Sequence, residues 1–293
     1  MRYAIRHVTR FDYGAPVQFA RCNLRLQPIA WSGQVLEDYA LSVEPGGRTS
    51  PARAEAGLAN AVRLVVERPA RHLSIESRSH VRVDRLIPVP SPGDPTLAEI
   101  AAWARVSTDL GPAGPAGYLF PTPLIPLDRD IAAWCAEELA PDRGVLEAAI
   151  ALALRIQREF TFDTTATLVD TPPRDAFLKR GGVCQDFAQV MISGLRAAGI
   201  PAAYASGYIR TLPPPGQPRL VGADATHAWV LVWCGPERGW EGVDPTNGIW
   251  MAGDHIVMAV GREYAEIAPI DGVMLGSGAA RLEVSVDVEP LGD

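Results

Sequence analysis

Cys184 stands in a sequence context that suits a reactive thiol. Gly181 and Gly182 come shortly before it, and from Cys184 onward apolar residues recur every three or four positions, as in an amphipathic helix. Free N–H groups and the dipole at the start of a helix favour the thiolate form, and glycines let the backbone turn and a substrate approach the sulfur. A buried structural cysteine is the simpler interpretation of this residue alone, because free cysteine is common in protein cores.

A nucleophilic thiol needs a base, and the chain has five histidines. His227 opens an apolar, β-prone run, a turn rich in glycine and proline follows at 234–239, and a second run ends in Asp244. If the two runs pair as a hairpin, His227 and Asp244 face each other with Cβ atoms about 4.5–5.5 Å apart. The carboxylate would then orient the imidazole and leave its other nitrogen for Cys184. A strand-edge histidine bonded to a nearby carbonyl is the competing interpretation of His227.

Cysteine, histidine and aspartate are also zinc ligands. The sequence has no HExxH, CxxC or paired-histidine spacing and offers no fourth ligand, so we expect no metal at this site. It has no calcium-loop pattern either. We therefore expect chemistry that needs no cofactor.

The composition is that of an ordinary globular protein, and the net charge argues against some classes of function. Of 293 residues, 47% are apolar and 21% charged, and the formal net charge of −7 argues against a broad nucleic-acid surface. The first residues lack the apolar segment of a signal peptide, and no apolar run is long enough to span a bilayer. The four cysteines lack CxxC spacing, so we expect a reduced, cytoplasmic protein that binds neither membrane nor nucleic acid.

The periodicity of the sequence predicts an α+β protein in three parts. Residues 1–86 form an antiparallel β-domain, residues 87–127 are a connecting region rich in proline and glycine, and residues 128–293 form a core of helices and strands. Period-2 alternation predicts strands at 39–43, 61–66, 73–83 and 280–288, and helical spacing predicts helices at 96–106, 128–139, 143–159 and 184–198.

Three segments resemble, in order, the three motif blocks of the bacterial transglutaminase-like superfamily, which contains papain-related thiol enzymes. They are "GGVCQDFAQVMISGLRAAGIPAAYASGYI", "DATHAWVLVW" and "GWEGVDPTNG". The segment "IRHVTRFDY…LRLQP" is similar to the β-rich N-terminal domain of one bacterial branch, and "DHIV…GREY…P" is similar to its C-terminal block. The resemblance covers nearly the whole chain.

The resemblance implies a papain-like core of helix and antiparallel sheet with a Cys–His–Asp triad. Cys184 would be the nucleophile, His227 the general base and acid, and Asp244 the orienting carboxylate. The backbone N–H of Cys184 is the natural first donor to an oxyanion, and the second donor stays unassigned. Gln185 follows the nucleophile and is a weaker candidate, since its side chain can point away.

Two positions depart from the pattern of that branch. Members often carry histidine where this chain has Gln189, and they often carry Asp and Gly in the turn that here spans 55–60. Neither departure removes a member of the triad. His255 and Arg262 belong to the C-terminal block, and the sequence leaves open whether they line the cleft or serve the structure.

Such a triad supports acyl transfer or hydrolysis at amide bonds through a cysteine thioester, with a peptide or protein amide as the substrate. Two alternatives stay open. One is an acyl-CoA-dependent N-acyltransferase, because a similar triad serves arylamine acetylation, and the other is a catalytically silent peptide-binding module. The resemblance also implies ATP-grasp and α-helical partner proteins, which accompany some relatives.

Overall fold

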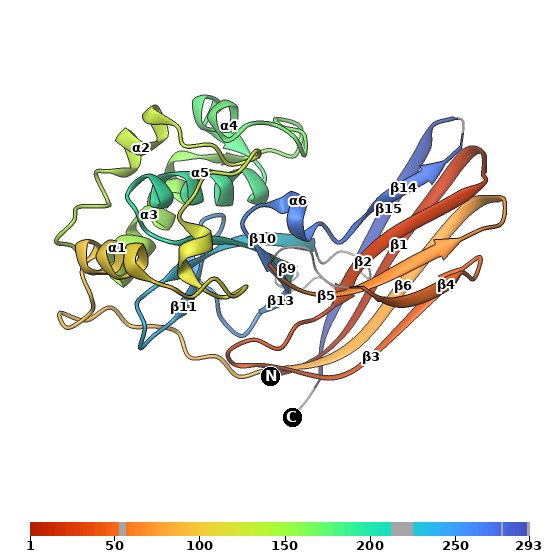
Figure 1. Ribbon diagram of the computed structural model, residues 1–293, viewed down its shortest axis with the longest axis horizontal. Helices are drawn as coiled ribbons and strands as arrows, with labels where there is room; N and C mark the ends of the chain where they lie inside the picture. Colours follow the sequence, from red (N-terminus) through yellow and green to blue (C-terminus); the bar gives the residue numbers. More distant parts are fainter. Residues whose placement is uncertain (53–56, 212–224, 277, 292–293) are drawn as a thin grey trace, which may run out of the picture.

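The computed structural model describes residues 1–52, 57–211, 225–276 and 278–291 and has the predicted α+β architecture (Figure 1). Helices gather on one side of the molecule, and long antiparallel strands extend from the other. The predicted turn at 55–60 lies partly outside the described residues, which exclude Glu55 and Ala56.

The first sheet joins the two ends of the chain. Within the described residues it has four antiparallel strands in the order β15–β1–β6–β3. Tyr3 and Ile5 of β1 are buried while Arg2 and Arg10 are exposed, which is the alternation of a half-buried strand. The predicted strands at 39–43, 73–83 and 280–288 are confirmed. Their bounds are β1 (Arg2–Val17), β3 (Gln34–Glu44), β6 (Ala70–Val83) and β15 (Ala280–Leu291).

The second sheet combines strands from the N-terminal and the C-terminal parts of the chain. In the described part of the chain its order is β12–β11–β10–β9–β13–β5–β2–β14, and β4 pairs with β5. The pairing of β13 with β5 links C-terminal to N-terminal strands, so it crosses the predicted domain limits at 86 and 127, which stay predictions. The bounds are β2 (Phe19–Gln27), β4 (Arg48–Ala52), β5 (Leu58–Val66), β9 (Ala202–Ile209), β10 (Ala225–Trp233), β11 (Trp240–Asp244), β12 (Ile249–Trp250), β13 (His255–Gly261) and β14 (Ile270–Leu275).

The four predicted helices are present, and one of them is shorter than predicted. The helix predicted at 128–139 ends at Cys135, after which the backbone bonds tighten to i→i+3, as between Glu138 N–H and Cys135 O. Within the described residues no helix is long and apolar enough to cross a membrane. The bounds are α1 (Leu97–Val106), η1 (Pro115–Tyr118), α2 (Arg129–Cys135), α3 (Val145–Glu159), α4 (Pro173–Lys179), α5 (Cys184–Ala197) and α6 (Tyr264–Ile267), with the short strands β7 (Thr161–Phe162) and β8 (Gly181–Gly182).

Helix α5 lies in the centre of the helical side, between α2, α3 and α4 and the sheet strands β9 and β10. An amphipathic helix normally leaves its polar side to water, but Gln189 and Arg196 of α5 are buried. Arg196 Nη2 instead donates to the carbonyl oxygens of Ala202 at 2.9 Å and Arg262 at 2.6 Å. Helix α5 is therefore held by contacts with the other helices and with the sheet, and these contacts fix the position of its first residue, Cys184.

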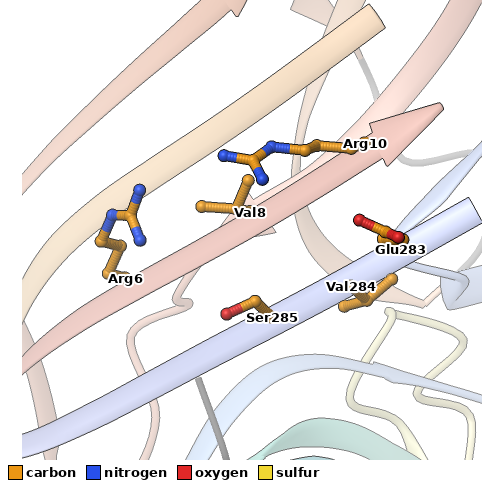
Figure 2. Close-up of a pocket in the computed structure, with 6 residues that line it drawn as sticks. All are labelled: Arg6, Val8, Arg10, Glu283, Val284 and Ser285. Carbon is orange, nitrogen blue, oxygen red and sulfur yellow. The ribbon is translucent and has the colours of Figure 1, made fainter. Parts of the chain in front are cut away.

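A shallow hollow of about 410 Å³ lies on the outer face of the first sheet (Figure 2). Arg6 pairs with Glu76 at 2.8 Å, and Arg10 lies opposite Glu283 in the strand register. The charges around the hollow are thus balanced by neighbours, and we assign no ligand to it. Its lining residues are Arg6, Val8 and Arg10 from β1 and Glu283, Val284 and Ser285 from β15.

His7 joins the two sheets and makes the stability depend on pH. Its Nδ1 lies 2.8 Å from Tyr208 Oη and its Nε2 lies 2.8 Å from Thr9 Oγ1, and burial lowers the His7 pKa to about 4. Between pH 6.5 and about pH 4 the unfolded chain binds a proton at His7 that the folded chain does not bind. We expect the free energy of unfolding to fall by up to ~3 kcal/mol across this window through His7.

Urea denaturation at pH 6.5 and pH 4 checks this expectation. His7→Gln keeps polar contacts without a titrating group, so its stability should fall less between the two pH values than that of the natural protein. Equal losses in both proteins would contradict the assignment.

Candidate active site

The local structure before α5 presents Cys184 at the first position of the helix. Asp186 Oδ2 accepts the N–H of Val183 at 2.8 Å and the hydroxyl of Thr167 at 2.6 Å, which fixes the helix start. A Cβ at Gly182 would lie 2.4 Å from that same carboxylate oxygen, so glycine is required there. As the first residue of α5, Cys184 has a backbone N–H without an intrahelical acceptor.

The hairpin that carries His227 and Asp244 is present, but the predicted register is wrong by two residues. Trp233 pairs with Trp240 and Val230 with Val243, so one further step places Asp244 opposite Trp229 rather than His227. The hairpin is centred on the predicted turn at 234–239, whereas direct pairing of His227 with Asp244 would centre it one residue earlier. A two-residue shift keeps a side chain on the same face of the sheet, and the predicted contact is made. His227 Nε2 lies 2.7 Å from Asp244 Oδ2.

Asp244 is completely buried and surrounded by hydrogen-bond donors. Its Oδ1 accepts the N–H groups of Thr246 at 2.9 Å and Asn247 at 3.2 Å, and its Oδ2 accepts Asn247 Nδ2 at 2.7 Å. Sequence reasoning missed Thr246 and Asn247, although Asp-Pro-Thr-Asn-Gly is typical of an aspartate that bonds the backbone two and three residues ahead. Burial by itself raises the Asp244 pKa, but the hydrogen bonds from His227 and His255 outweigh it and lower that pKa.

His227 is placed between an acid and a thiol. Burial lowers its pKa, but the hydrogen bonds with Asp244 and with the Cys184 thiol raise the pKa to about 10. Asp244 occupies Nε2, so Nδ1 is the ring nitrogen left for Cys184. At neutral pH the ring is therefore an imidazolium, with a proton that it can give to a leaving group.

Of the two residues left open by the sequence, His255 contacts Asp244 and Arg262 does not take part in the site. His255 Nε2 lies 3.2 Å from Asp244 Oδ2, and burial lowers the His255 pKa, so this ring stays neutral at neutral pH. Arg262 instead donates from Nε to Glu266 at 2.6 Å, in an ion pair at the start of α6. Gln185 donates to the Val169 carbonyl at 2.7 Å, which removes its amide from the oxyanion candidates.

His227, Asp244 and His255 also have the spacing of a metal centre, with ligand atoms within 4.8 Å of one another. The hydrogen bonds argue against this use. A metal on His255 Nε2 would put the ring proton on Nδ1, yet Nδ1 faces the N–H of Ala252 at 3.3 Å, which is a donor. The pattern favours a hydrogen-bond network in which Asp244 accepts from both histidines.

Two protein families match separate parts of the chain. Residues 132–245 match the family described as "Transglutaminase-like superfamily", and this range contains Cys184, His227 and Asp244. Residues 3–82 match the family described as "Bacterial transglutaminase-like N-terminal region". The two matches fall on the helical core and on the N-terminal strands.

Related proteins extend over most of the chain. Uncharacterized proteins of Mycobacterium tuberculosis and Mycobacterium bovis are 35% identical over 299 residues, covering 99% of this chain and 93% of theirs. A protein-glutamine gamma-glutamyltransferase of Pseudomonas aeruginosa is 40% identical over 116 residues, which are 38% of this chain and 17% of that protein. A Cytophaga hutchinsonii protein described as a candidate cysteine protease has the same fold, with a TM-score of 0.74, 20% identity, and coverage of 100% of this chain and 92% of its own.

Proposed function

This chain belongs to the transglutaminase-like superfamily, and we propose that it is an enzyme that acts on peptide or protein amides through Cys184, His227 and Asp244. The family carries out thiol-based acyl transfer or hydrolysis. The proposal is carried by one observation: His227 Nε2 lies 2.7 Å from Oδ2 of the buried Asp244, and the neighbouring Cys184 is among the groups that raise the His227 pKa. The name of the Pseudomonas aeruginosa relative supports a glutamine carboxamide as the acyl donor.

In the first half of the reaction the Cys184 thiolate attacks the carbonyl carbon of the amide. A C–S bond forms and the carbonyl electron pair moves onto oxygen, where the N–H of Cys184 is the proposed donor. As the electron pair returns, the C–N bond breaks and the His227 imidazolium gives its proton to the leaving amine or ammonia. A thioester on Cys184 and a neutral His227 remain.

In the second half an acceptor attacks the thioester. His227 takes a proton from water or from an amine, a new C–O or C–N bond forms, and the thiolate leaves. Water gives a carboxylic acid, whereas an amine gives an isopeptide bond. Asp244 holds the ring in one orientation through both halves and stabilises its charged form.

Mass spectrometry of glutamine-containing peptides, incubated with the protein in the presence and absence of a primary amine, tests the proposal. We expect either a gain of about 1 Da from deamidation or addition of the amine with loss of ammonia. Peptide fragments would instead indicate proteolysis, the other amide reaction of this site. Protein alkylated beforehand with iodoacetamide serves as the control and should leave every peptide unchanged.

Two outcomes would overturn the proposal. Transfer of an acetyl group from acetyl-CoA to Cys184, with all peptides unchanged, would identify an N-acyltransferase. Unchanged peptides together with a Cys184 that iodoacetamide does not alkylate at neutral pH would identify a silent binding module. Cytoplasmic location and the ATP-grasp and α-helical partners stay predictions, which fractionation and co-purification can test.

A further inference from the structure

The second histidine of the site, His255, has no part in the reaction steps above. It is 1% exposed, its ring packs edge-on against Trp229 with centroids 5.2 Å apart, and its Nε2 lies 3.2 Å from Asp244 Oδ2. Its Nδ1 accepts the N–H of Ala252, so the ring proton is on Nε2 and is donated to Asp244. His255 is therefore a neutral donor with a single orientation.

Two side chains from the N-terminal β-region hold the backbone around His255. Arg85 Nη1 donates to the carbonyl oxygens of Ala252 at 2.8 Å and His255 at 3.1 Å. Gln34 bonds both backbone groups of Val257, donating from Nε2 to its oxygen and accepting its N–H at Oε1, each at 2.8 Å. The first residues of β13 are thus fixed by side chains that come more than 160 positions earlier in the chain.

Gln34 is buried and Arg85 is partly buried, and their surroundings support a specific role. Gln34 is 2% exposed, and burial of the Arg85 guanidinium lowers the Arg85 pKa to about 10. Burying an amide or a guanidinium is unfavourable unless its donors find acceptors. Gln34 Nε2 and Arg85 Nη1 find theirs in backbone carbonyls of the segment that carries His255, whereas Arg85 Nη2 makes no hydrogen bond within the described residues. Tyr3 adds a third contact to the same segment, with its hydroxyl 2.8 Å from Asp254 Oδ1.

We propose that His255 is a positioning residue for Asp244, and that the N-terminal β-region is part of the active-site scaffold through Gln34 and Arg85. The proposal rests on the proposed function, since Asp244 matters there by orienting His227. Oδ2 of Asp244 receives three donors, from His227, Asn247 and His255. Without His255, one side of a buried carboxylate oxygen loses its donor, and the carboxylate can rotate away from His227.

Paired substitutions at His255 test the positioning role. His255→Leu fills the space without a donor and should lower kcat about tenfold while KM changes less than about twofold, because misalignment affects the reaction steps and not binding. His255→Gln keeps a donor near the position of Nε2 and should retain kcat within about threefold of the natural protein. A kcat loss of the same size in both variants would overturn the role of the donor.

The scaffold role of the N-terminal region has its own pair of variants. Arg85→Met keeps the aliphatic stem but loses both carbonyl contacts, and it should lower kcat in the same direction as His255→Leu. Arg48→Met is the matched control, because Arg48 is an exposed arginine of the same region that pairs with Glu67. Equal kcat in the two arginine variants would overturn the scaffold role.

Alkylation of Cys184 by iodoacetamide at pH 7 tests the inference without a substrate. The rate follows the population of the thiolate–imidazolium pair, so it should fall in His255→Leu and Arg85→Met and recover in His255→Gln. If peptides are never modified but these rate differences appear, the proposed function fails and the positioning role stands. A rate in His255→Leu equal to or above that of the natural protein overturns the positioning role.

Discussion

Cys184→Ala will abolish amide turnover, with a loss in kcat of at least ~10⁴-fold, because no other group can form the thioester. The fold should survive. Cys184 is only partly buried, and alanine suits the first turn of a helix. Thermal denaturation of both proteins, run beside the peptide assay, separates loss of chemistry from loss of structure.

Cys22→Ala is the matched control for this prediction. Cys22 is 1% exposed on β2, and burial raises the pKa of its thiol to about 11, so it should take no part in the reaction. We expect this variant to keep normal turnover. Turnover that persists in Cys184→Ala would end the assignment of the nucleophile.

Asp244→Asn should lower kcat by about 10³- to 10⁴-fold. The reason lies in the donors around the carboxylate. Oδ2 faces His227, His255 and Asn247 Nδ2, and Oδ1 faces two backbone N–H groups. Whichever way the asparagine amide turns, its NH₂ group meets donors, so the site cannot accept it without moving His227. Measured kcat and the alkylation rate of Cys184 at pH 7 should fall together.

The protein provides a matched histidine–aspartate pair for this test. Asp38 Oδ2 lies 2.8 Å from His80 Nδ1 on the first sheet, and both side chains are exposed. Asp38→Asn should therefore leave kcat unchanged. If Asp244→Asn retained kcat within about tenfold of the natural protein, orientation by Asp244 would not be essential to the reaction.

The sequence was sufficient to predict the features that depend on local periodicity. Two glycines before a helical pattern located the start of the helix at Cys184, and two β-prone runs on either side of a turn set His227 and Asp244 opposite each other in a hairpin. That prediction survived a wrong register because a shift of two residues returns a side chain to the same face. The turn at 234–239 was predicted from its composition, and the register was wrong because the hairpin is centred on that turn and not on the midpoint between His227 and Asp244.

His255 and its supports could not be predicted in this way. In the sheet order, β13 is separated from β11 by β10 and β9, so no local pattern reveals that His255 reaches Asp244. The same holds for Arg85 and Gln34, whose contacts depend on how N-terminal strands join the second sheet. The burial of Gln189 and Arg196 on α5 could not be predicted either, because it depends on contacts with distant parts of the chain, such as that of Arg196 with the Arg262 carbonyl.

The pairing of β1 with β15, which sets Arg2 opposite Leu291, has a consequence for biosynthesis. β15 follows β1 by more than 260 residues in the chain, so during synthesis the first sheet lacks this strand until β15 has been made. Non-local pairing of this kind is slow, and until it is complete β1 keeps an unpaired edge that other chains can join.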